Sequence, residues 1–127
     1  MTKMLIVEDN KSFRQELKYL VASRFPHLNI EEALDEKEAL EKISSSLPDF
    51  IFMDINLGGE SGLELTSKIK RTYSDIVIII ISSYDLPEYR NAAKQSGADY
   101  FVSKGGSSAG EILALVESIL TTLNPKD

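Results

Sequence analysis

The strongest constraint on the fold is an unbroken run of isoleucine and valine at residues 76–81. Apolar runs at 4–7 and 50–53 likewise lack the alternation of a strand with one exposed face. Strands with continuous apolar runs are covered on both faces, which is typical of a parallel sheet between two layers of helices. Residues 28–31 alternate and predict a half-exposed edge strand, and residues 99–103 predict a short fifth strand.

Helical patterns separate these strands. The residues expected to face inward in the first two helices are Phe13, Leu17, Leu20 and Val21, then Ala39, Leu40 and Ile43. In the first helix, Arg14 is predicted to lie on an outer face. Helix N-caps are predicted at Asp35, Ser61 and Ser108. Gly97 is predicted to end a helix that begins near Pro87. The order is therefore (βα)5, and right-handed crossovers make it a doubly wound α/β fold with a parallel five-stranded sheet.

Composition excludes several kinds of function. The chain has 127 residues, no cysteine and a single histidine, so thiolate chemistry and a multi-histidine metal site are ruled out. His27, in a proline-containing turn, is expected at the surface. The net charge of −6 argues against direct nucleic acid binding by this domain. No apolar run approaches the roughly 20 residues of a membrane span, so we expect a cytoplasmic protein without membrane contact.

Several functional side chains end the predicted strands. Glu8 and Asp9 follow the first strand, Asp54 closes the third, Ser82 ends the fourth, and Lys104 follows the fifth. The carboxyl ends of parallel strands form the ligand-binding edge of open α/β sheets, so these side chains are expected to converge. Taken singly, each has an ordinary interpretation: a helix cap for the first pair, turn residues for Asp54 and Ser82, and a solvated lysine.

Together these residues favour a metal and a phosphoryl group. Three neighbouring carboxylates repel one another, and Mg²⁺ prefers such oxygen ligands. Three acids and one lysine leave a charge of about −2, which one Mg²⁺ neutralises. The metal and Lys104 could then both hold the oxygens of a phosphoryl group, to which the Ser82 hydroxyl could also donate a hydrogen bond.

The ordered set Glu8-Asp9, Asp54, Ser82 and Lys104 on a (βα)5 chain resembles the receiver domain of two-component response regulators. The resemblance covers residues 3–123 and implies a flavodoxin-like sheet of strand order 2-1-3-4-5. It implies a receiver domain over 1–123, with 124–127 as a tail or the start of a linker.

The resemblance also assigns roles to residues. Asp54 would accept a phosphoryl group from a histidine kinase or phosphotransfer protein. Glu8, Asp9, Asp54 and the main-chain carbonyl of Asn56 would hold Mg²⁺. Ser82 and Lys104 would bind the phosphoryl oxygens, and Phe101 would change rotamer as the switch residue, although plain core packing also explains an aromatic there.

Further partners follow from the family. The switch would control an output domain or partner protein, with a helix-turn-helix DNA-binding domain outside this chain as one option and transcription regulation as the expected role. A homodimer formed on phosphorylation stays open. Gly105 replaces the proline that is common after the lysine, which resembles the NarL/LuxR-type branch. Without the proline, the turn after Lys104 is expected to be looser or differently shaped. Gly58 also replaces a common proline, which favours mobility of the loop after Asp54.

Three alternatives remain. FMN binding is disfavoured because the loop after the first strand is acidic. A phosphatase of the haloacid-dehalogenase kind is disfavoured because Asn56 stands where such enzymes carry a general acid. A receiver that is never phosphorylated and acts as a docking module is the third, and a Mg²⁺ titration would separate it from a working receiver. On the favoured interpretation the chain is a signalling switch rather than an enzyme.

Overall fold

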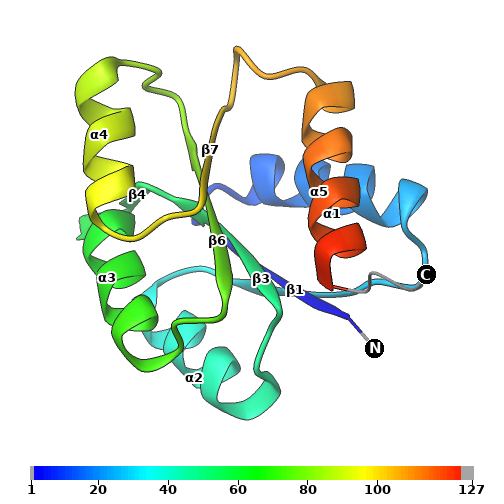
Figure 1. Ribbon diagram of the computed structural model, residues 1–127, viewed down its shortest axis with the longest axis horizontal. Helices are drawn as coiled ribbons and strands as arrows, with labels where there is room; N and C mark the ends of the chain where they lie inside the picture. Colours follow the sequence, from blue (N-terminus) through cyan, green and yellow to red (C-terminus); the bar gives the residue numbers. More distant parts are fainter. Residues whose placement is uncertain (1, 124–127) are drawn as a thin grey trace.

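The computed structural model describes residues 2–123, with five parallel strands in one sheet and five helices around it (Figure 1). The sheet strands are β1 (Lys3–Val7), β2 (Asn29–Ala33), β3 (Phe50–Asp54), β6 (Val77–Ser82) and β7 (Tyr100–Ser103). Their spatial order is β2-β1-β3-β6-β7, which is the predicted order 2-1-3-4-5. The predicted fold class is confirmed. The expected tail at 124–127 lies outside the described residues.

Helices cover both faces of the sheet. They are α1 (Lys11–Arg24), α2 (Glu36–Ser46), α3 (Gly62–Thr72), α4 (Pro87–Gln95) and α5 (Ala109–Leu123). Helices α1 and α5 lie on one face, and α2, α3 and α4 lie on the other (Figure 1). The strands β3 and β6 between these layers are almost wholly buried, which explains their continuous apolar sequences.

The predicted helix ends are where the sequence places them. Asp35 and Ser61 accept hydrogen bonds from the main chain three residues on, and Ser108 and Glu111 form a complete capping box. Gly97 has φ of +100°, directly after the C-cap of α4. These caps fix where each helix starts or stops, and so the length of each loop at the sheet edge.

Two expectations about helix faces are wrong. Arg14 is buried on the same face of α1 as Leu17 and Val21 instead of facing solvent. Leu40, expected to face inward, is 39% exposed on α2. A short hairpin was not predicted: β4 (Asn56–Leu57) pairs antiparallel with β5 (Glu60–Ser61) in the loop after Asp54. Two-residue strands are too short to produce a sequence pattern of their own.

Within residues 2–123, no helix has the length and apolar character that crossing a membrane requires. His27 is exposed, as its turn position predicts.

Candidate functional site

All the candidate side chains meet at the carboxyl edge of the sheet. Asp54 is the last residue of β3 and Ser82 the last of β6, while Glu8 and Lys104 directly follow β1 and β7. β1 and β6 each pair with β3 in parallel, and β7 pairs with β6, so the four strand ends lie side by side. The main-chain N–H of Lys104 donates to the carbonyl of Ser82 at 2.8 Å, which joins the last two loops.

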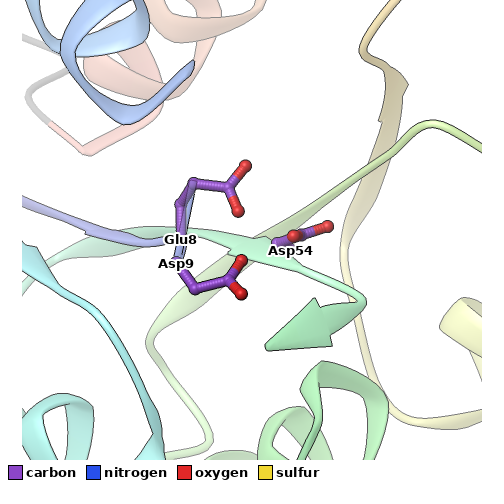
Figure 2. Close-up of side chains that lie close together, drawn as sticks. All are labelled: Glu8, Asp9 and Asp54. Atoms are coloured by element: carbon purple, nitrogen blue, oxygen red, sulfur yellow. The ribbon is translucent and has the colours of Figure 1, made fainter. Parts of the chain in front are cut away.

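Three carboxylates form the acidic part of the site. One oxygen from each of Glu8, Asp9 and Asp54 lies within 4.8 Å of the other two. Figure 2 shows these side chains extending from the ends of β1 and β3. Glu8 and Asp54 are buried, whereas Asp9 is exposed. Burial raises the pKa of the Glu8 carboxyl above its ordinary value, and the neighbouring Asp54 raises it further.

Lys104 supplies the positive charge. Its Nζ lies 2.5 Å from an oxygen of Glu8 and 3.5 Å from an oxygen of Asp54. The same ammonium group lies 4.6 Å from the centroid of the Phe13 ring on α1. An aromatic face attracts a cation without neutralising it, so Phe13 helps to hold the lysine over the acids. The sequence did not single out Phe13, whose position resembles that of any core-facing helix residue.

A pocket of about 220 Å³ opens beside Asp54. Its lining includes the predicted residues Asp9, Asp54, Asn56, Ser82 and Lys104, together with Asn10, Ile55, Gly58, Ser83 and Tyr84. Glu8, next to Asp9 in the chain, is only 1% exposed. The Ser82 hydroxyl oxygen accepts a hydrogen bond from the Tyr84 N–H at 2.9 Å, so its own proton can be donated. The pocket therefore offers an acceptor carboxylate with hydrogen-bond donors beside it.

Gly62 sets the position of Asp54. A Cβ on Gly62 would lie 1.8 Å from the Asp54 carbonyl oxygen, so α3 can approach the end of β3 this closely only with glycine. The Gly62 N–H also donates to the Ile55 carbonyl at 2.7 Å. The sequence presented Gly62 only as part of a capping box, and nothing in that pattern reveals a close approach between main chains.

The loop after Asp54, for which Gly58 predicts mobility, forms the β4–β5 turn. Gly58 and Gly59 have φ of +62° and +102°, which glycine adopts without strain, and they form the tight connection of the hairpin. A Cβ on Gly58 would lie 3.2 Å from a carboxylate oxygen of Asp9. The hairpin thus brings main chain close to the acids.

The turn after Lys104 is also defined by hydrogen bonds. The Ser103 hydroxyl accepts from the Gly106 N–H at 2.9 Å, and the Ser107 hydroxyl accepts from the Ser103 N–H at 3.0 Å. Two serines thus shape the turn that contains Gly105, and the expectation that this turn is looser or differently shaped stays a prediction.

Arg14 holds the main chain of Glu8, the first of the two adjacent acids after β1. Its Nη1 donates to the Glu8 carbonyl at 2.9 Å, and its Nε pairs with Glu32 of β2, also at 2.9 Å. These contacts attach the main chain of Glu8 to a neighbouring strand. A spacing of three from Arg14 to Leu17 was the one available signal that this residue belongs to the buried face.

Phe101 lies on β7, half-buried against the cluster formed with α2, α3 and α4. Tyr100 precedes it and is 43% exposed. The guanidinium of Arg90 on α4 lies over the Phe101 ring, 4.6 Å from its centroid. The predicted switch residue therefore sits between the sheet and α4.

The donor set fits a hard divalent cation. Each of the three clustered acids offers a carboxylate oxygen, the ligand type that Mg²⁺ prefers. Two of the acids are buried next to each other, and a cation would offset both the burial and the neighbouring Asp54 that raise the Glu8 pKa.

Comparison with known protein families identifies the family of this chain. Residues 4–117 match the response regulator receiver domain family. The chain belongs to this family. Curated relatives of the receiver domain include the response regulator MprA of Mycolicibacterium vanbaalenii, 29% identical over 98% of this chain and 53% of the relative. MprA of Mycobacterium avium is 29% identical as well, with 54% of its length covered. The receiver domain here thus spans about half the length of the curated relatives it matches.

Solved structures of response regulators have the same fold as this chain. A two-component response regulator from Clostridium difficile superimposes with a TM-score of 0.88 at 28% identity, covering 98% of this receiver domain and 99% of that chain. A LuxR-family response regulator from Aurantimonas sp. SI85-9A1 gives 0.86 at 27% identity, with 96% and 87% covered. A LuxR-family protein among the similar structures is in line with the predicted branch.

Proposed function

We propose that this receiver domain accepts a phosphoryl group on Asp54 from a histidine kinase or phosphotransfer protein and passes the signal to an output. Response regulator receiver domains are signalling switches, and the match of this chain to that family supports the proposal. The observation that carries the proposal is the position of Asp54. Asp54 lines a pocket together with Asp9, Ser82 and Lys104, and its carboxylate is clustered with those of Glu8 and Asp9.

Glu8, Asp9, Asp54 and the main-chain carbonyl of Asn56 would hold Mg²⁺. When bound, the ion offsets negative charge on the acids and on an incoming phosphoryl group. The raised pKa of Glu8, caused first by burial and then by its neighbour Asp54, supports this assignment, because a bound cation would favour the ionised carboxylate. Gly58 supports it too, because a side chain there would press on Asp9.

In the transfer itself, an Asp54 carboxylate oxygen forms a bond to phosphorus as the bond from phosphorus to the donor nitrogen breaks. The electron pair of that bond stays on the imidazole nitrogen of the donor. Lys104 and the Ser82 hydroxyl donate to the phosphoryl oxygens, whose negative charge they stabilise. Lys104 must turn from Glu8 towards the phosphoryl group to do so, and its 3.5 Å distance from Asp54 makes that a short movement.

Asn56 limits the chemistry to the chain's own phosphorylation. It lines the pocket at the place where an aspartyl-phosphate phosphatase would carry a general acid, and an amide cannot protonate a leaving alcohol. Slow hydrolysis of the phosphoryl group by water remains, with Asn56 and Tyr84 beside the site to influence its rate. We therefore propose a switch rather than a phosphatase.

Phe101 is proposed as the residue that responds to the phosphoryl group. Movement of Ser82 towards the new oxygens changes the space beside β7, in which Phe101 is half-buried. The surface around α4 and β7 would then act on an output domain or partner protein, with DNA binding by such a domain as one outcome and homodimer formation as another. Because the partner kinase would use ATP, we propose that this protein acts in the cytoplasm.

A Mg²⁺ titration separates this proposal from a docking module that is never phosphorylated. At a concentration 100 times its dissociation constant, a ligand of the native state stabilises by about 2.7 kcal/mol. Mg²⁺ is expected to raise the thermal midpoint by several degrees, and Asp9→Asn is expected to remove most of that rise. Glu41→Gln is the matched control, since Glu41 is exposed on α2. A midpoint that does not respond to Mg²⁺ would favour the docking module.

Lys104→Ala is expected to weaken capture of the phosphoryl group more than it destabilises the domain when Mg²⁺ is present. Hydrogen bonds between charged groups contribute about 1.5–3 kcal/mol, so binding of beryllofluoride, a stable phosphoryl mimic, should weaken at least tenfold. The measurement is a ¹⁹F NMR titration beside thermal melts at the same Mg²⁺ concentration. Lys11→Ala controls for general electrostatics at this edge, because Lys11 is exposed on α1. A large loss of thermal stability with unchanged binding would contradict the assigned role.

A further inference from the structure

Arg90 on α4 makes two contacts that together fix its guanidinium. The guanidinium lies 4.6 Å from the centroid of the Phe101 ring, and its Nε pairs with a carboxylate oxygen of Asp85 at 2.5 Å. This hydrogen bond also keeps the pKa of Asp85 below its ordinary value. The Asp85 carboxylate therefore holds the guanidinium of Arg90 in place over the ring.

Asp85 belongs to the loop that carries the site hydroxyl. It lies three residues after Ser82, whose hydroxyl oxygen accepts from the Tyr84 N–H. Tyr84 in turn stacks on Tyr89 of α4, with ring centroids 5.4 Å apart. We expect a movement of Ser82 to reach the first turn of α4, which contains Arg90, through Tyr84 and Asp85.

Helix α4 is less buried than its neighbour α3. All of α4 is described, and of its residues only Ala93 is buried, whereas α3 buries four. The N-cap of α4 is Leu86, which provides no side-chain hydrogen bond to the described helix start. The contact between Arg90 and Phe101 is therefore one of the interactions that join the N-terminal half of α4 to the sheet.

We propose that Arg90, held by Asp85, is a positioning residue that keeps Phe101 in its unphosphorylated position and so opposes phosphoryl binding at Asp54. The inference rests on the proposed function, in which Phe101 responds to the phosphoryl group. The inference adds that the contact between Arg90 and Phe101 must break when a phosphoryl group binds at Asp54. The ion pair is half exposed and contributes little by itself. Its role is to orient the guanidinium, so that the energetic effect comes from the contact with the ring.

The test is the affinity of the full chain for beryllofluoride in saturating Mg²⁺, measured by ¹⁹F NMR. Arg90→Ala is expected to bind about two to five times more tightly than the wild type, the effect of losing a partly exposed cation–π contact. Arg90→Lys should lie between the two, because an ammonium keeps the charge without the flat guanidinium face. Lys94→Ala removes the same charge from an exposed position on α4 and should match the wild type.

A double-mutant cycle shows whether the effect passes through the ring. In a Phe101→Leu background, Arg90→Ala should cause no further change in affinity. The Arg90 side-chain protons should also show ring-current shifts that disappear in Phe101→Leu and on addition of beryllofluoride. An affinity of Arg90→Ala equal to or weaker than that of the wild type overturns the proposal. Absence of binding by the wild type is a separate result, which overturns the proposed function and this inference with it.

Discussion

Gly62→Ala is expected to lower the free energy of unfolding by about 3 kcal/mol or more, at the upper end of the range for overpacking. The added Cβ would lie 1.8 Å from the Asp54 carbonyl oxygen and 2.8 Å from its carbonyl carbon. Both are main-chain atoms of the central strand β3, so no side-chain rotation relieves the contact. Either α3 moves outward or the end of β3 shifts, and the second movement also displaces the Asp54 carboxylate.

Urea denaturation followed by circular dichroism measures this loss. Gly105→Ala is the matched control, because a Cβ there has no neighbour within 4 Å and Gly105 is not among the residues with positive φ. The control is expected to change stability by less than about 0.5 kcal/mol. Equal stabilities of the two variants would show that α3 and β3 do not approach each other as described.

Asp54→Asn is expected to abolish phosphorylation while leaving the fold intact. An amide cannot attack phosphorus, and no other acid stands at the same place in the pocket. Without Mg²⁺ the variant should be more stable than the wild type by about 1 kcal/mol, because one of two adjacent buried carboxylates is neutralised. The stabilisation by Mg²⁺ should shrink at the same time, since a metal ligand is lost.

Thermal melts with and without Mg²⁺ measure both effects. Asp75→Asn removes a carboxylate from an exposed loop and is the matched control. If Asp54→Asn melted well below the wild type in the absence of Mg²⁺, the Asp54 carboxylate would be stabilising the fold. The claim that the clustered acids destabilise the fold until Mg²⁺ binds would then be wrong.

The sequence predicted the sheet and the residues at its edge because both depend on order along the chain. A fully buried parallel strand must be continuously apolar, as at 76–81, and its carboxyl end is the point where the run stops. Once the strands at 4–7, 50–53, 76–81 and 99–103 are parallel neighbours, the residues that end them must converge. The convergence of Glu8, Asp9, Asp54, Ser82 and Lys104 follows from that topology, and their charges favour a metal and a phosphoryl group. The assignment of Asp54 as the phosphoryl acceptor rests on the resemblance and remains a proposal.

What the sequence did not predict are contacts between elements. Arg14 is buried because two acceptors, the Glu8 carbonyl just after β1 and the Glu32 carboxylate on β2, both bind it. A periodicity rule classes every arginine as outward-facing and cannot foresee such partners. The close approach at Gly62 and the position of Arg90 over Phe101 likewise depend on how a helix rests on the sheet. These contacts decide how firmly the predicted site residues are held.

The central claim is that Asp54 is a phosphoryl acceptor, and intact mass spectrometry after incubation with a small-molecule phosphodonor tests it most directly. The wild type is expected to gain the mass of one phosphoryl group only when Mg²⁺ is present, and Asp54→Asn is expected to gain none under the same conditions. An adduct that persists in Asp54→Asn, or that forms equally well without Mg²⁺, would contradict the account.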